Sequence, residues 1–138
     1  MSERRNHGVI LFAHGARDAQ WADPFRRLRD ILQRRAPGVA TELAFLEHMR
    51  PDLVTAVGRL ADQGIERITL VPLFMARGGH LRHDLPQIVT NAAAVHPGVV
   101  IRTTDAIGDV ASLLEAIADW VLHEHERTGE ADLDNPIA

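Results

Sequence analysis

The sequence predicts an α/β fold with three layers: a four-stranded parallel sheet in the order 2-1-3-4, with helices on both faces. Two observations predict it. Short apolar segments alternate four times with helical patterns along the 138 residues, and the connections between them are short. Such a repeat is typical of a parallel sheet covered by helices. Hydrophobic residues make up 46% of the chain and charged residues 25%, which is ordinary for a compact globular domain.

The four strands are expected where apolar residues run without a helical period, at Gly8–Ala13, Thr41–Phe45, Arg67–Leu73 and Val99–Thr103. The first and third are the most apolar and should lie in the middle of the sheet. Glu42 and Arg102 place the second and fourth strands at its edges. Pro72 must lie near the end of its strand, because proline has no N–H for the ladder.

Helices are expected between the strands and after the last one. The second begins at Pro51 and ends at Gly64, the third spans Leu85–Val95, and the last follows Asp109 as its cap. Right-handed crossovers place the first helix on one face of the sheet and the next two on the other. The apolar positions expected to face the sheet are Trp21, Phe25, Leu28 and Leu32 in the first helix, Leu53, Val57 and Leu60 in the second, and Val110, Leu113, Leu114, Ile117 and Val121 in the last.

The length suits a single domain, which we assign to residues 1–128, followed by an acidic tail at 129–138 that we expect to be frayed. There are no cysteines, which excludes disulfides, thiolate metal sites and cysteine nucleophiles. All 15 basic residues are arginine, so a Schiff-base lysine is excluded. The net charge is −4, and no apolar stretch approaches the ~20 residues of a membrane span. We therefore expect a cytoplasmic protein that binds neither nucleic acid nor membrane.

Polar residues follow three neighbouring strands of the predicted sheet. His14 comes directly after the first strand, Glu47 follows the second, and His80 lies beyond the third. The chain reverses direction between the first and third strands, and ligands of open α/β sheets bind at such a point, beyond the carboxyl ends of the strands. Two imidazoles and a carboxylate there would suit a divalent metal ion with open positions, and the same groups could accept protons.

Each of these residues also has a purely structural explanation. His14 alone is compatible with a loop or capping position, and His80 with the first turn of a helix. Glu47 could cap the helix that starts at Pro51, and Gly78-Gly79 could form a simple turn. Their expected meeting at one edge of the sheet favours a functional site.

The same loops carry apolar residues beside arginines. Phe74 and Met75 follow the third strand, ahead of Arg77, Gly78, Gly79 and Arg82, while Arg17 and Arg50 lie in the first two loops. Arginine binds carboxylates through paired hydrogen bonds. Together these residues suit a large flat ligand that is apolar at its centre and carboxylated at its edge. No G-x-G-x-x-G or G-K-[ST] motif is present, which disfavours a nucleotide.

Four motifs resemble the small sirohydrochlorin chelatases of the class II chelatase group: His14-Gly15-x-Arg17-Asp18, Ala44-Phe45-Leu46-Glu47, Val71-Pro72-Leu73-Phe74 and Gly78-Gly79-His80-x-x-x-Asp84-x-Pro86. The resemblance runs from about Gly8 to Asp105, with Ala16 where many relatives have serine. It implies a chelatase half-domain fold, a homodimer, and insertion of a divalent metal into sirohydrochlorin. It also implies that His14 and His80 bind the metal and that Glu47 assists.

We therefore expect ATP-independent insertion of Co²⁺ or Fe²⁺ into sirohydrochlorin, in cobalamin or siroheme synthesis. The metal, with Ni²⁺ as a further candidate, would be a substrate, and no tightly bound cofactor is expected. His14 and His80 would hold the ion and relay protons, and Glu47 would be the proton sink and a possible third ligand. Two alternatives stay open: a non-catalytic carrier of metal or tetrapyrrole, and a histidine phosphatase. The phosphatases carry arginine directly before the histidine, where this chain has Ala13.

Overall fold

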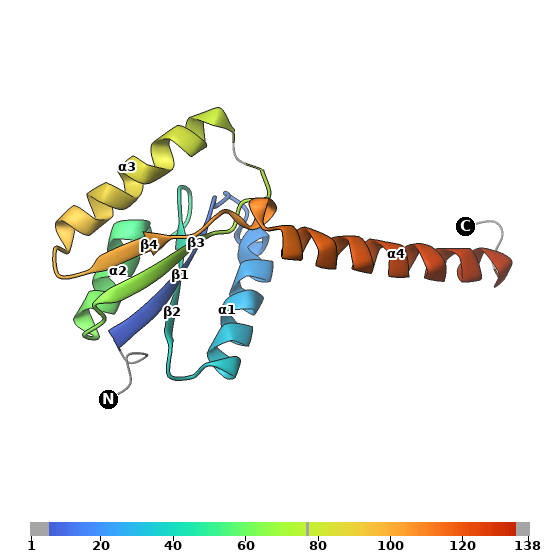
Figure 1. The fold of residues 1–138 in the computed structure, drawn as a ribbon, viewed down its shortest axis with the longest axis horizontal. Coiled ribbons are helices and arrows are strands. Elements are labelled where there is room, and N and C mark those ends of the chain that lie inside the picture. Colours follow the sequence, from blue (N-terminus) through green and yellow to red (C-terminus); the bar gives the residue numbers. More distant parts are fainter. Residues whose placement is uncertain (1–5, 77, 135–138) are drawn as a thin grey trace.

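A single parallel sheet forms the centre of the molecule (Figure 1). The fold is described from a computed structural model that covers residues 6–76 and 78–134, with side chains as far as residue 130. Its strands are β1 (His7–Ala13), β2 (Ala40–Phe45), β3 (Arg67–Pro72) and β4 (Val100–Thr103). They lie in the order β2-β1-β3-β4, all parallel, which confirms the predicted order. Pro72 pairs with Phe12 and is the last residue of β3. This confirms the expected position at the end of the strand, where the missing N–H disturbs the ladder least.

The helices are α1 (Asp23–Arg35), α2 (Leu53–Asp62), α3 (Gly79–Val95) and α4 (Ala111–Asp134), and two short 3₁₀ turns, η2 (Ala19–Ala22) and η3 (Ile107–Asp109), precede α1 and α4. α3 begins well before Leu85, where the sequence pattern placed it. Gly78 lies just ahead of the helix in extended backbone, and Gly79 is already its first residue. The glycine pair therefore opens a helix instead of forming a separate turn.

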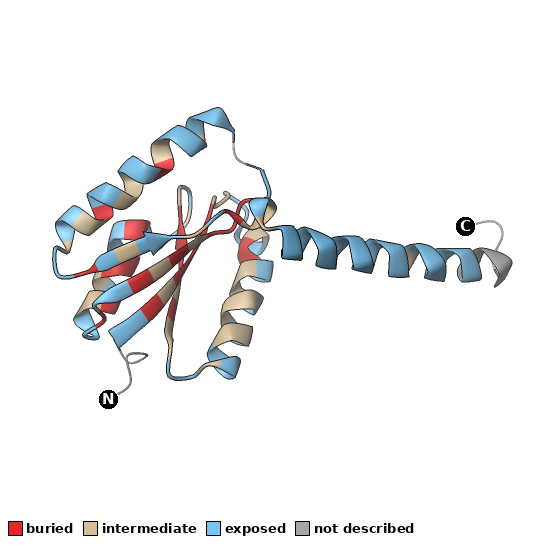
Figure 2. Ribbon diagram, viewed as in Figure 1, coloured by how far each residue is buried: buried red, intermediate tan, exposed pale blue. Residues whose placement is uncertain are grey.

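Two hydrophobic cores lie on opposite faces of the sheet (Figure 2). Ile10 and Phe12 of β1 point into the core beneath α2 and α3, which includes Leu60 and Leu85. The residues between them, Leu11 and Ala13, point into the core beneath α1, which also holds Leu43 and Phe45 of β2. β1 is thus buried on both sides, as its unbroken apolar run predicts. The distribution confirms that α1 covers one face and α2 and α3 the other.

The last helix departs from the expectation. α4 leaves the body of the protein and extends into solvent, in contact mainly with η3 (Figures 1 and 2). The prediction that its apolar side faces the sheet is wrong: Leu113, Leu114, Ile117 and Val121 are 42–50% exposed. The helix also continues through Gly129 to Asp134, where a frayed tail was expected, and residues 135–138 lie outside the described part. The periodicity correctly predicts an amphipathic helix but does not say what covers it.

Within residues 6–76 and 78–134, no helix is both long enough and apolar enough to cross a membrane.

Candidate functional site

The loops that follow β1 and β2 are joined by their main chains. The amide of Leu46 donates to the carbonyl oxygen of Ala13 at 2.9 Å, and the amide of Glu47 donates to that of His14 at 3.0 Å. These bonds continue the ladder between β1 and β2 beyond the ends of the strands. His14 and Glu47 therefore lie side by side at the carboxyl edge of the sheet.

Gly15 is the residue that lets the two loops approach so closely. Its φ is +90°, a conformation that glycine adopts without cost. A Cβ atom on Gly15 would lie 1.9 Å from the carbonyl oxygen of Glu47, far inside contact distance. Only glycine fits between the imidazole-bearing residue and the opposing loop.

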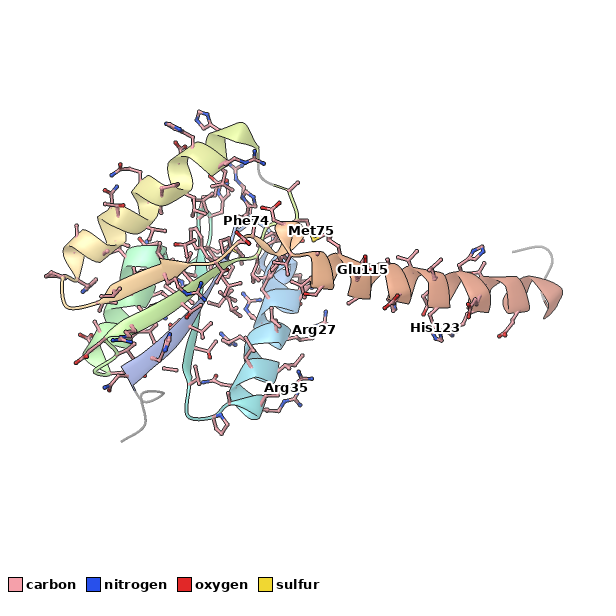
Figure 3. The ribbon with its side chains drawn as sticks, viewed as in Figure 1. Arg27, Arg35, Phe74, Met75, Glu115 and His123 are labelled. Carbon is pink, nitrogen blue, oxygen red and sulfur yellow. The ribbon has the colours of Figure 1, made fainter. Side chains whose placement is uncertain are left out.

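The ring of His14 packs on Phe74, near the start of the loop that follows β3. Their centroids are 4.5 Å apart with an angle of 52° between the planes, and Phe74 meets Phe12 edge-on at 6.0 Å. Phe74 is 2% exposed, so it supports the His14 ring and has little surface for a ligand. Its expected contact with a ligand stays a prediction. Met75, the next residue, is 56% exposed and does present its side chain to solvent (Figure 3).

A pocket of about 510 Å³ opens beside the loop after β2. Glu47 and Arg50 line it together with His48, whose φ of +65° places it in the left-handed region. Nε2 of His48 lies 3.8 Å from Oε1 of Glu47. Thr55 and Arg59 of α2 complete the wall, and the sequence analysis did not single them out. Their four-residue spacing, which puts both on one face of the helix after Pro51, is the signal that could have found them.

The start of α2 is fixed at the wall of this pocket by Asp52. Its carboxylate accepts a hydrogen bond of 2.9 Å from the amide of Thr55 and caps the helix. Hydrogen bonding from the side chain and the amide of Thr55 lowers the pKa of Asp52 below its ordinary value, and the nearby charge of Arg50 adds to the effect. Asp52 is thus an anion at neutral pH.

The third part of the site is the beginning of α3. His80 is fully exposed, with its Nε2 3.8 Å from Oδ2 of Asp84 one turn later. Arg82 is also exposed, and its amide donates to the carbonyl oxygen of Gly78 at 3.1 Å. A Cβ atom on Gly78 or Gly79 would meet nothing within 4 Å, so the fold itself does not require glycine at either position. Arg77, expected to bind substrate, lies outside the described residues.

The three predicted metal and proton-transfer residues are not gathered into one centre. Among the residues that the structure describes, no three His, Asp or Glu side chains lie close enough together to hold a metal ion. His14 and Glu47 share the joined loops, whereas His80 extends from the first turn of α3 into solvent. Binding by His14 and His80 stays a prediction. Arg17 is exposed in the loop after His14, and beside it the side chain of Asp18 accepts from the amide of Gln20 at 2.9 Å.

Comparison with known proteins assigns the family. The model of the CbiX family matches residues 8–124, which span the sheet from the second residue of β1, all three loops of the site and more than half of α4. The chain belongs to the CbiX family. This confirms the resemblance stated from the sequence motifs.

Two relatives with similar sequences are both named sirohydrochlorin cobaltochelatase. A sirohydrochlorin cobaltochelatase of Sulfurisphaera tokodaii is 29% identical over 125 residues, which cover 88% of this chain and 99% of the relative. A second, from Methanothermobacter thermautotrophicus, is 33% identical over 82 residues, 59% of this chain and 57% of its own.

Solved structures agree with the CbiX assignment and confirm the fold class. A cobalamin biosynthesis CbiX protein from Marinobacter aquaeolei superposes with a TM-score of 0.75 at 40% identity, covering 88% of this chain and 98% of that one. The sirohydrochlorin chelatase SirB from Bacillus subtilis, in complex with cobalt, gives a TM-score of 0.71 at 23% identity. The match covers 83% of this chain and 49% of SirB, and at this identity it bears on the fold alone.

Proposed function

We propose that this chain is an ATP-independent chelatase that inserts Co²⁺ or Fe²⁺ into sirohydrochlorin. One observation carries the proposal: the main-chain bond between Glu47 and His14 brings the residues that bear a carboxylate and an imidazole to the same point on the carboxyl edge of the sheet. Glu47 lines an open pocket at this edge, the chain belongs to the CbiX family, and two relatives with similar sequences are named sirohydrochlorin cobaltochelatases.

The reaction needs groups that bind a metal ion and groups that take up protons. Insertion of a divalent ion forms bonds from the metal to the ring nitrogens and releases two protons from pyrrole N–H groups. The His14 imidazole offers a nitrogen ligand of the kind that Co²⁺, Fe²⁺ and Ni²⁺ accept. In this proposal the exposed carboxylate of Glu47, on the loop bonded to His14, receives a released proton. In the same proposal His80, in the first turn of α3, is the second metal ligand.

The exposed arginines and the glycine pair suit the tetrapyrrole itself. Arg50 lines the pocket beside Glu47 and Arg82 is exposed on the first turns of α3, so both could pair with carboxylates at the edge of the ring. The absence of Cβ atoms on Gly78 and Gly79, where the fold would tolerate them, leaves room for a flat ligand to approach the backbone. Met75 offers an apolar contact next to them.

The decisive experiment is anaerobic incubation of the protein with sirohydrochlorin and Co²⁺, Fe²⁺ or Ni²⁺, followed by absorbance. We expect a metal-dependent spectral change faster than in the protein-free control, with many turnovers per chain. His14→Ala and His80→Ala should each remove most of the insertion rate. The control His123→Ala, at an exposed position on α4, should leave the rate unchanged. A rate equal to the protein-free control for every metal would refute the proposal. Stoichiometric binding without turnover would make the chain a carrier instead.

Two further parts of this proposal concern the surroundings of the chain. We infer that it works as a homodimer, which the family resemblance implies, and that it acts in the cytoplasm, as expected from its composition. Sedimentation of the purified protein tests the first, and fractionation of the source cells tests the second.

A further inference from the structure

His48, in the loop after β2, has a backbone conformation that glycine would adopt more easily. Its φ is +65°, and among the described residues it is the only one besides glycine with a positive φ. The amide of Met49 donates to the carbonyl oxygen of Glu47 at 2.8 Å, so the chain turns about His48 alone, in the pattern of a classic γ-turn. Residues held in such conformations cluster at functional sites. A histidine at this position therefore points to a role for its imidazole.

The imidazole of His48 faces the carboxylate that precedes it. Nε2 of His48 lies 3.8 Å from Oε1 of Glu47, and the two side chains are 36% and 59% exposed. Both residues line the pocket of about 510 Å³ beside the loop. Within the part of the chain that the structure describes, this imidazole is the only basic group within 4 Å of that carboxylate. A nitrogen ligand and an oxygen ligand are thus paired where a solute can reach both.

The other charges along this pocket have partners of opposite sign. Nη1 of Arg59 lies 3.4 Å from Oε1 of Glu42, and the charge of Arg50 stabilises the anionic form of Asp52. Glu47 has no arginine within 4 Å among the described residues. A cation that enters the pocket from solvent therefore finds one carboxylate that no guanidinium neutralises, with an imidazole beside it.

The spacing of the pair suits a divalent metal ion that must later leave. Imidazole nitrogen and carboxylate oxygen are ligands that Co²⁺ and Fe²⁺ accept. Two such ligands, each about 2.1 Å from an ion and in neighbouring positions, lie about 3–3.5 Å apart. The observed 3.8 Å between His48 and Glu47 reaches this range through a small side-chain rotation. Because only two protein atoms would hold the ion, with water in the other positions, binding would be weak and reversible.

The loop bonded to this one supplies a destination for the ion. The amide of Glu47 donates to the carbonyl oxygen of His14, so the pair adjoins the residue proposed to bind the metal during insertion. An ion that moves on from Glu47 also leaves the carboxylate free. The same group can then receive a pyrrole proton, which is the role proposed for it above.

We propose that His48 and Glu47 form a capture site for the divalent metal substrate, which binds there from solvent before it reaches His14 and the tetrapyrrole. In the capture step, Nε2 of His48 and Oε1 of Glu47 replace two water molecules bound to the ion. The inference rests on the proposed chelatase function and adds to it the route by which the metal enters.

The first test is steady-state insertion with Co²⁺ as the varied substrate and sirohydrochlorin saturating. His48→Asn removes the imidazole and keeps a residue that tolerates the left-handed region, and it should raise KM for Co²⁺ about tenfold with a much smaller loss in kcat. His48→Arg should raise KM as much, because arginine can pair with Glu47 but offers no metal ligand. The matched control is His123→Asn, at an exposed position on α4, which should behave as wild type.

The outcomes separate this site from the function itself. An unchanged KM for Co²⁺ in His48→Asn, or normal kinetics in His48→Arg, would overturn the capture site and leave the chelatase standing. A wild type that inserts no metal would refute the chelatase, and binding of the metal alone would then decide whether the site exists. Calorimetry without tetrapyrrole should show at least about tenfold weaker Co²⁺ binding by His48→Asn than by wild type. Equal affinities would overturn the site.

A second test marks the site directly, and it is possible because the chain has no cysteine of its own. Thiolate bound to Co²⁺ gives a strong charge-transfer absorption in the near ultraviolet. We expect this band when Co²⁺ is added to His48→Cys, and its loss in His48→Cys/Glu47→Gln. Val100→Cys is the control: it places an exposed thiol on β4, paired with Arg67 of β3, and should give no band. A band that persists without Glu47, or that never forms in a folded His48→Cys, would overturn the proposal.

Discussion

The amide of Glu47 donates to the carbonyl oxygen of His14 at 3.0 Å, so the carboxylate and the imidazole of the proposed site belong to one continuous ladder. Main-chain atoms in two parallel segments therefore set the relative position of the two residues. The fold brings both residues to one edge of the sheet without a side-chain contact between them having to form first.

Gly15→Ala tests how much this arrangement depends on close approach of the two loops. We expect a loss of about 2–3 kcal/mol in the free energy of unfolding and loss of most chelatase activity, because the added Cβ collides with the carbonyl oxygen of Glu47. Gly64→Ala is the matched control: its φ is +86°, but a Cβ there meets nothing within 4 Å. It should cost only about 1 kcal/mol and leave activity intact. Urea unfolding measures the loss of stability, and the insertion assay measures the loss of activity. Equal effects in the two variants would show that the close approach of the two loops is unimportant.

Phe74→Leu should weaken metal binding by more than its effect on stability explains. The substitution keeps most of the buried volume and should cost less than about 1.5 kcal/mol of unfolding free energy. It removes the ring that packs on His14, however, and should loosen the imidazole. Phe12→Leu, in the same core but with its ring against Phe74, is the control for core packing. Calorimetric titration with Co²⁺ should show weaker binding by Phe74→Leu than by Phe12→Leu. Equal Co²⁺ affinities of the two variants would show that Phe74 does not support the imidazole.

Replacing both Gly78 and Gly79 by alanine should separate folding from substrate binding. Nothing in the protein opposes the added Cβ atoms, and alanine favours helix at the start of α3, so stability should stay constant or rise by up to about 1 kcal/mol. Sirohydrochlorin affinity should fall several-fold, because the ligand can no longer approach the backbone. Gly38→Ala, also in open space, should leave affinity unchanged. Fluorescence titration and thermal unfolding are the measurements, and unaltered affinity of the double variant would count against a ligand at this turn.

Arg50→Ala and Arg82→Ala should each raise KM for sirohydrochlorin roughly three- to tenfold and lower kcat much less. Arginines that pair with carboxylates at the edge of the ring bind the ground state and the transition state alike. Arg34→Ala, an exposed residue in the last turn of α1, is the control and should behave as wild type. Steady-state kinetics decide the point, since a loss confined to kcat would place these arginines in the chemical step.

The cap at Asp52 should give stability a defined pH dependence. At neutral pH, Asp52→Ala should cost about 1 kcal/mol and Asp52→Asn less, because asparagine still caps the helix. The pKa of Asp52 is lowered in the folded state from its ordinary 3.8, so the contribution of its charge is present above about pH 4 and is lost as the pH falls through the lowered value. Wild type and Asp52→Asn should therefore converge in acid. Urea unfolding from about pH 7 down to about pH 2 measures this, and a constant gap would contradict it.

The strand order could be predicted because the strands differ in how apolar they are, and this difference indicates which of them lie in the middle of the sheet and which at its edges. The run at Gly8–Ala13 is apolar at every position and is buried on both faces, whereas Glu42 and Arg102 are positions that only edge strands tolerate. The helix at α3 was placed too late because Gly78-Gly79 suggests a turn, and no local pattern shows that the helix starts at Gly79.

Other features depend on contacts between distant segments and could not be predicted. The requirement for glycine at position 15 arises only because the loops after β1 and β2 are joined, so that a Cβ atom there would collide with Glu47. Phe74 was expected to contact a ligand in the loop after the third strand, and nothing in the sequence shows that its position beneath His14 buries it. The apolar period of α4 predicts burial, yet Leu113, Ile117 and Val121 are exposed, because a period of hydrophobic residues carries no information about where the helix packs.

The loop after β2 is held almost entirely by bonds that any amino acid can make. Besides the bonds of Leu46 and Glu47, the amide of Met49 donates to the carbonyl oxygen of Glu47 at 2.8 Å, and the amide of Phe45 donates to that of Pro51 at 2.9 Å. The exposed side chains at positions 47 and 50 can therefore change during evolution without altering the path of the loop. Selection for another metal or another pigment can act on the chemistry of this edge while the architecture that presents it is inherited unchanged.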